Sequence, residues 1–258
     1  MAPKRAATDP KGKATVQDGT SAAMARAAAL EGALPRTRVT AAWVAKVRQL
    51  AAASTNEHGA TEMRPAGSRL TEAFYPIFLH TLYAGLVPPF SDFLFAILET
   101  YQIQLLHLHP NSILILAIFA YLCEAYVGIR PSVALFRSFY SLRSTMQNER
   151  LGCVSFRIAD ARSEIYIPIA WCGEDAITKV TKKVEKFRER WLFVDTKGTN
   201  PLLEVPEVPP RKWARWASAD LDDPELDRVY ECIRKLRVGG LTGQMVAKDF
   251  MRRRIAPL

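Results

Sequence analysis

The feature that most constrains the fold is an uninterrupted apolar run of 11 residues, Ile113–Cys123, near the middle of the chain. A helix that spans a membrane needs about 20 apolar residues, so this run predicts a buried core helix and no membrane partner. Pro110 stands where the first turn of a helix tolerates proline, and Gly128 suits the position just past its end. Because such a helix is apolar all round, other apolar elements must surround it.

Three neighbouring segments supply those elements. A helix is expected to begin at Ser91, with Asp92 in its first turn, and another is expected to begin at Pro131. The segment Thr71–Leu86 is aromatic and apolar, is interrupted by Pro76, and is expected to continue as an aromatic helix around His80. The residues expected to face inward from the two later helices are Phe93, Leu94, Ile97, Leu98 and Tyr101, and Val133, Leu135, Phe136, Phe139 and Tyr140.

The pattern changes after Gly152. Cys153–Ile158 and Glu164–Ile169 alternate with period two and predict a β-hairpin across a five-residue turn. Asp175–Arg190 predicts a charged amphipathic helix, and Trp191–Val194 predicts a third strand. The fold class expected is therefore α+β and predominantly helical: an apolar helical core domain followed by a β-hairpin or short sheet and C-terminal helices.

Changes in composition divide the chain into six parts. The predicted parts are a disordered basic tail (1–20), Ala-rich helices and a polar linker (21–68), the helical core (69–146), the hairpin with the amphipathic helix (147–199), a Pro-rich connector (200–223) and a C-terminal helix pair (224–258).

The positive charge lies outside the core. The 258 residues carry a formal net charge of +9, yet residues 65–146 hold as many basic as acidic side chains. A nucleic-acid surface would therefore belong to the flanks. The N-terminus lacks the apolar stretch of a secretory signal, so we expect a reducing intracellular compartment, either nucleus or cytoplasm.

The cysteines and histidines predict no metal site and no cofactor. The four cysteines, Cys123, Cys153, Cys172 and Cys232, are widely spaced and form no Cys-x-x-Cys motif. We interpret them as reduced structural thiols. Either His107 or His109 is expected to cap the helix that follows, together with Asn111 and Ser112.

No motif for nucleophilic catalysis or for phosphate binding occurs in the sequence, and no small-molecule substrate is inferred. Three carboxylates can hold two metal ions in nucleases and transposases. The candidates here are Asp160, Glu174 or Asp175, and Asp195, but the two or three strands predicted after Gly152 are too few for the usual mixed sheet. We therefore expect no enzyme, with a degenerate metal-dependent transposase or nuclease as the alternative.

The C-terminal helix pair has the outline of a helix-turn-helix. Thr242 is a credible N-cap, but Gly243, Gln244 and Met245 occupy the positions that would read bases. The cations cluster at the other end, where they offset the helix dipole in any protein, and we favour that role. Phosphate contact stays an alternative for Lys248, Arg252, Arg253 and Arg254.

A second basic segment, Arg211–Trp216, alternates cations with indoles after the Pro-rich connector. This pattern suits stacking on single-stranded nucleic acid, with Lys212 and Arg215 as phosphate ligands. It equally suits a segment that buries Trp213 and Trp216 and leaves its cations in water, which is the interpretation we favour.

The central block resembles a known family. Its signature residues are Gly85-Leu86-Val87-Pro88, His107-Leu108-His109-Pro110-Asn111-Ser112-Ile113, Leu122-Cys123-Glu124-Ala125-Tyr126-Val127-Gly128-Ile129 and Pro131…Leu135-Phe136-Arg137. With these motifs, residues 78–143 resemble the plant domain called "transposase (putative), gypsy type", which occurs in many proteins encoded by grass retrotransposons. The final segment, 240–258, is similar to stretches found downstream in such proteins.

The resemblance implies origin more firmly than activity. The family has no established catalytic residues to place on this sequence, and no reverse-transcriptase, protease, integrase or zinc-knuckle motif is present. We therefore expect a transposable-element-derived, non-catalytic module that self-associates or associates with nucleic acid through its basic flanks. The remaining alternative is a relic fragment with no retained function.

Overall fold

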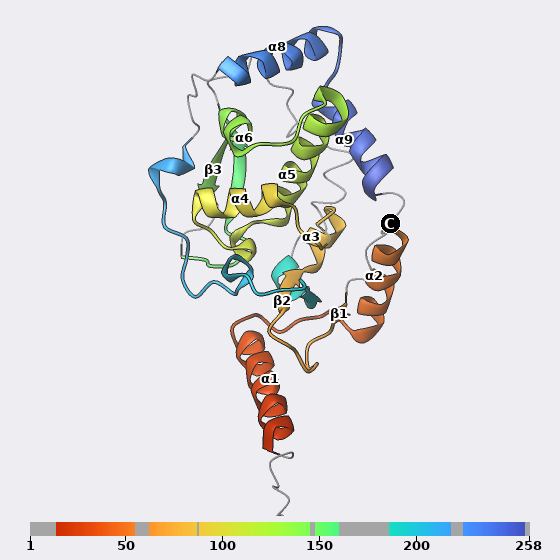
Figure 1. Ribbon diagram of the computed structural model, residues 1–258, viewed down its shortest axis with the longest axis vertical. Helices are drawn as coiled ribbons and strands as arrows, with labels where there is room; N and C mark the ends of the chain where they lie inside the picture. Colours follow the sequence, from red (N-terminus) through yellow and green to blue (C-terminus); the bar gives the residue numbers. More distant parts are fainter. Residues whose placement is uncertain are drawn as a thin grey trace, which may run out of the picture.

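The computed structural model describes residues 14–54, 62–86, 88–144, 148–159, 186–217 and 224–255. Within these residues the fold is α+β and predominantly helical, as the sequence predicts. Figure 1 shows the helices gathered around α5, with short strands beside and below it.

The predicted core helix is confirmed. Helix α5 (Pro110–Leu122) continues into a π-helical turn, η2 (Cys123–Val127), and ends at Gly128, whose φ is 77°. Pro110 is its first residue, and His109 caps it: the His109 Nδ1 accepts a hydrogen bond from the Asn111 N–H at 3.2 Å. By length and composition Pro110–Val127 could cross a membrane, but 56% of this window is buried inside the protein. It is the central helix of the core.

Two further helices pack beside α5. Helix α4 (Asp92–Tyr101) begins where Ser91 Oγ accepts a hydrogen bond from the Leu94 N–H at 3.3 Å, which confirms the predicted cap. Helix α6 (Val133–Phe139) is capped in the same way by Ser132. Aromatic rings from α4, α5, α6 and two nearby strands meet in one cluster formed by Phe93, Phe119, Phe136, Tyr140 and Phe156.

A strand replaces part of the predicted aromatic helix. Residues Phe74–Phe78 form β2, and only Leu79–Tyr83 are helical, as α3. Phe74 and Phe78 pack into one apolar cluster while Tyr75 and Ile77 pack into another, so β2 is buried on both faces. A strand buried on both faces has a continuous apolar sequence, which cannot be told from a buried helix by periodicity. Pro76 is tolerated because β2 lies at the edge of its sheet.

The described strands form two antiparallel sheets. The first has the order β1-β5-β2, with β1 at Met63–Arg64 and β5 at Trp191–Asp195. The predicted strand at 191–194 is thus confirmed, and its partners are β1 and β2. The second sheet pairs β3 (Tyr140–Ser144) with β4 (Val154–Ile158).

The second sheet contains the first strand of the predicted hairpin. Val154–Ile158 is a strand, but its partner among the described residues is β3, which lies before it in the chain. The expected partner, Glu164–Ile169, lies outside the described residues, as does most of the predicted helix Asp175–Arg190. Tyr140 was expected in a helix but begins β3, because α6 ends at Phe139 and an extended segment follows.

The remaining helices surround this centre. Helix α1 (Ala14–Gly32) extends below the body in Figure 1, α2 (Ala41–Ser54) lies at one side, α8 (Pro224–Val238) lies at the top, and α9 (Gly243–Phe250) lies beside α5. The short turns are η1 (Leu105–His107), η5 (Phe187–Glu189), η6 (Pro201–Leu203), η7 (Ala214–Trp216) and the π-helical η8 (Met251–Ile255). One apolar cluster includes side chains from Val39 to Phe250, so both flanks contribute to the core.

Candidate nucleic-acid interface

The two groups of basic residues singled out in the sequence do not lie together. Turn η7, near Lys212 and Arg215, packs on β3 and α4, whereas α9, with the cations of the C-terminus, packs on α5. Figure 1 shows η7 (light blue) and α9 on opposite sides of the molecule. These groups therefore do not form one continuous basic surface.

Two arginines of the C-terminal group, Arg252 and Arg253, form hydrogen bonds to Asp249 of α9. Asp249 Oδ1 accepts hydrogen bonds from Arg252 Nη2 at 2.8 Å and from Arg253 Nε at 2.9 Å. Asp249 Oδ2 accepts a hydrogen bond from the Tyr121 hydroxyl at 2.6 Å and a longer one from Tyr126 at 3.3 Å. These hydrogen bonds and the arginine charges lower the pKa of Asp249 far below its usual value. Asp249 thus fastens α9 to α5, and the arginines support that contact.

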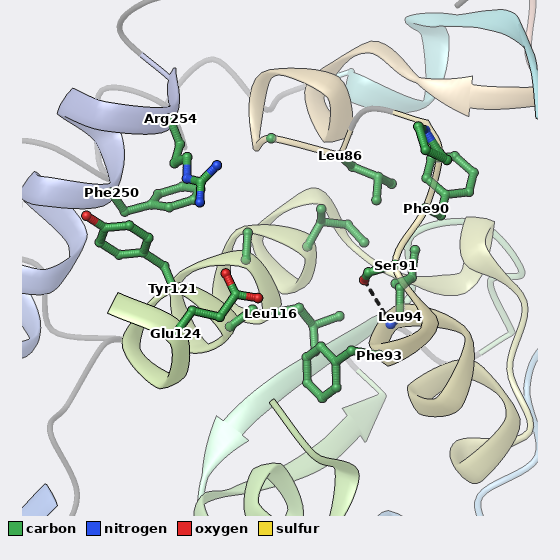
Figure 2. Close-up of a pocket in the computed structure, with 15 residues that line it drawn as sticks. Leu86, Phe90, Ser91, Phe93, Leu94, Leu116, Tyr121, Glu124, Phe250 and Arg254 are labelled. Carbon is green, nitrogen blue, oxygen red and sulfur yellow. Dashed lines mark hydrogen bonds between the residues drawn. The ribbon is translucent and has the colours of Figure 1, made fainter. Parts of the chain in front are cut away.

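Arg254 lines an apolar hollow of about 380 Å³, which lies between residues 85–124 and the C-terminal elements α9 and η8. Figure 2 shows that its walls are mostly apolar, with Phe90 and Phe93 at one end. Glu124, Tyr121 and Arg254 lie toward the other end, and Glu124 and Arg254 are the charged residues among those that line it. Gly85 lets η8 approach here, since a Cβ at that position would lie 3.2 Å from Ile255 Cδ1. The hollow offers apolar surface but few polar groups for chemistry.

The second hollow, of about 570 Å³, combines cations with an exposed indole. Arg143, Arg157 and Lys212 line it, and all three side chains are exposed. Trp213 lines it too and is 42% exposed. We call this hollow the basic groove.

Strand pairing explains why cations from distant positions meet in the basic groove. Ser141 and Arg143 lie two residues apart on β3 and therefore on one face of the sheet. Ser141 is paired in register with Arg157 of β4, and the Arg157 Nε donates a hydrogen bond to Ser141 Oγ at 2.9 Å. The register thus places the two arginines as diagonal neighbours.

The buried indole of Trp216 holds in place the segment that brings Lys212 and Trp213 to the basic groove. Trp216 is 5% exposed, and its Nε1–H donates a hydrogen bond to the Tyr101 carbonyl at 3.1 Å. This contact fixes η7 against α4. The Arg215 guanidinium lies 6.0 Å from the centre of the Trp213 ring, at the outer limit of a cation–π contact.

The two indoles of Arg211–Trp216 therefore differ. The favoured expectation that both are buried is correct for Trp216, whose indole N–H bonds to the Tyr101 carbonyl, and wrong for Trp213, which is 42% exposed. Arg143 and Arg157 were missed by the sequence reasoning. The alternation of apolar and polar residue types in Tyr140-Ser141-Leu142-Arg143 is the signal that could have indicated Arg143.

His107 and His109 form hydrogen bonds to backbone groups. The Gln104 N–H donates to His107 Nδ1 at 2.9 Å, so His107 Nε2 carries the proton and donates to the Val208 carbonyl at 3.2 Å. Burial lowers the pKa of His107, and it lowers that of His109 to about 4 with help from the charge of Arg188. Among the described residues no three His, Cys, Asp or Glu side chains are grouped to hold a metal ion.

Burial controls the chemistry of two of the described thiols. Cys123 and Cys153 are buried, and burial raises their pKa to about 12 and about 11, so both stay protonated at neutral pH. Cys232 is half-buried. Cys172 lies outside the described residues.

The alternative carboxylate site is represented by one described residue. Asp195 ends β5, and its Oδ1 accepts a hydrogen bond from the Lys197 N–H at 2.9 Å, which stabilises the turn after the strand. Asp160, Glu174 and Asp175 lie outside the described residues.

Comparison with known families identifies the central segment. The chain is an α+β protein with an apolar central helix, and its sequence contains no recognisable catalytic motif. The class of protein is therefore defined by the fold. The family model described as "Putative gypsy type transposon" matches residues 77–144, about a quarter of the chain, and confirms the resemblance seen in the sequence. This segment is a transposon-derived domain of that family. No curated protein and no solved structure matches the chain.

Proposed function

We propose that this chain is a non-catalytic, nucleic-acid-associated module and that the basic groove is its contact surface. The observation that carries the proposal is the meeting of Arg143, Arg157 and Lys212 with the exposed ring of Trp213. These cations come from three separate segments, so the fold itself gathers them.

The chemistry of the groove suits a single strand. Cations along a groove attract the phosphate backbone, and an exposed aromatic ring stacks on bases of any sequence. Hydrogen bonding to Ser141 holds the Arg157 side chain in place, which reduces the entropy that it would lose on binding. The Arg215 guanidinium beside Trp213 adds a further positive charge.

The test is the salt dependence of binding. Fluorescence anisotropy with a labelled single-stranded oligonucleotide should give a slope of log affinity against log salt near −2, since each of three neutralised phosphates contributes about −0.7. Arg143→Gln and Lys212→Gln should each weaken binding and reduce the slope by about 0.7. Trp213→Ala should weaken it by about 1–3 kcal/mol, and Trp213→Phe should retain most of the affinity.

A matched control lies on the opposite side of the molecule. Lys248→Gln removes an exposed cation from α9, and it should leave the affinity and the slope nearly unchanged. Binding that is insensitive to Arg143 and Lys212 but is lost with Lys248→Gln would refute the basic groove as the contact surface.

Self-association is a second candidate, which the exposed apolar side chains at the α8–α9 turn support. Val238 is 84% exposed and Met245 is 53% exposed. Light scattering at micromolar concentration should then give a mass above that of the monomer, and Val238→Lys should lower it. A monomer at all concentrations would exclude this role.

A further inference from the structure

We infer that a third hollow, which shares Trp213 with the basic groove, binds an unpaired nucleobase. This inference rests on the proposed function and deepens it. The hollow measures about 530 Å³, which is within the range of about 300–1,000 Å³ usual for small-molecule sites. Trp213 lines both this hollow, which we call the base pocket, and the basic groove.

The walls of the two hollows differ in chemistry. Three cations line the basic groove, whereas Arg211 is the charged residue among those that line the base pocket. The other polar side chains of the lining are the amides of Gln102 and Gln104, the His107 imidazole and the Trp213 indole, and the rest of the walls are apolar. An amide side chain can donate and accept hydrogen bonds at once, as the edge of a base requires.

The position of Gln102 makes its amide available. Gln102 directly follows α4 with φ at 53°, and it is an exposed residue of the pocket lining. Gln104 has a structural role as well, because its Nε2 donates a hydrogen bond to the Pro201 carbonyl at 3.3 Å. Gln102 is therefore the amide that can bind a ligand without breaking a described contact of the wall.

The pocket is formed before any ligand enters. The Pro-rich connector forms one wall, and it is tied to the α4–η1 turn by the hydrogen bonds from Gln104 to Pro201 and from His107 to Val208. Pro209 and Pro210 restrict the backbone of the same wall. A preformed pocket loses little entropy on binding.

The two hollows together define a path for a nucleotide. Its phosphate would lie among the cations of the basic groove, while its base would pass along Trp213 into the base pocket. Because the edge of the base would face the amide of Gln102, it must be free of a pairing partner. The ligand class is therefore single-stranded nucleic acid with at least one unstacked base.

An abasic oligonucleotide separates the two hollows, because it keeps the phosphates and lacks the bases. The wild-type chain should bind an ordinary single strand roughly 5- to 100-fold more tightly than an abasic strand of equal length. A duplex of the same sequence should bind no better than the abasic strand. Gln102→Leu, which keeps the side-chain size, should weaken binding of the ordinary strand several-fold and leave binding of the abasic strand unchanged.

Gln244→Leu is the matched control, since Gln244 is an exposed glutamine on the distant helix α9. It should change neither affinity. Equal affinity for ordinary and abasic strands, with the salt slope intact, would overturn the base pocket and leave the basic groove standing. Equally tight binding of the duplex would overturn it too. The absence of salt-dependent binding to any strand would overturn the proposed function itself.

Discussion

Gly152 provides the sharpest test of the packing beneath β4. Its φ is +57°, in the left-handed region that favours glycine, and its N–H donates a hydrogen bond to the Leu106 carbonyl at 2.7 Å. A Cβ at this position would lie 2.3 Å from Cζ and 2.4 Å from Cε2 of Phe187. Gly152→Ala therefore meets two separate penalties, one from the backbone and one from the ring.

The magnitude follows from these two penalties. Left-handed backbone costs a non-glycine residue about 1 kcal/mol, and forcing extra volume into a packed site costs about 1–3 kcal/mol. The ring has little room to retreat, because Phe187 is 6% exposed and lies edge-on to Phe78 at 5.2 Å and to His109 at 4.9 Å. We expect Gly152→Ala to lower the free energy of unfolding by about 2–4 kcal/mol.

A double-mutant cycle separates the two penalties. Phe187→Leu removes the ring atoms that the new Cβ would meet, so in Gly152→Ala/Phe187→Leu only the backbone penalty should remain. Urea unfolding followed by circular dichroism should give a favourable coupling energy of about 1–3 kcal/mol. Strictly additive effects would show that Phe187 does not pack on Gly152, and the reasoning would then be refuted.

Two further predictions concern ionisable groups. Asp249→Asn should lower the thermal midpoint of unfolding, because it weakens the hydrogen bonds to Tyr121, Arg252 and Arg253, and an unchanged midpoint would contradict this role. The wild-type chain should also lose stability as the pH falls from about 6.5 toward about 4, since unfolded His109 binds a proton in this window and folded His109 does not. This loss is at most about 3 kcal/mol, and His109→Asn, which keeps a capping side chain and cannot titrate, should flatten the unfolding profile over that window.

The parts of the fold predicted from sequence are those set by local signals. Helix α5 was predictable because its apolar run, Pro110 and Gly128 all act within one element. The caps at Ser91 and Thr242 follow from the same local chemistry, since each side-chain oxygen accepts a hydrogen bond from an N–H three residues later.

The pairing of strands depends on distant segments, which the sequence pattern does not report. An alternating segment shows that a strand exists but not which partners it takes, so the pairing of β4 with β3 was not predicted. The strand β2 was missed because it is buried on both faces.

The same difference between local and long-range signals explains which residues of the candidate site could be predicted from the sequence. Lys212 and Arg215 could be selected from their sequence because they alternate with indoles over a few residues. Arg157 could not be selected, because its place beside Lys212 depends on the pairing of β3 with β4 and on the contact between Trp216 and Tyr101. Sequence reasoning thus found the part of the groove that one segment contains.

The origin of the basic groove bears on what the family match means. Residues 77–144 supply the central helix and one strand of the groove, including Arg143, but Arg157, Lys212 and Trp213 all come from the chain that follows. The neutral charge of the central block agrees with this, since the cations that could bind phosphate are mostly added from outside it. The groove is therefore a property of the central domain together with its downstream segments, and nucleic-acid binding of the kind proposed requires both.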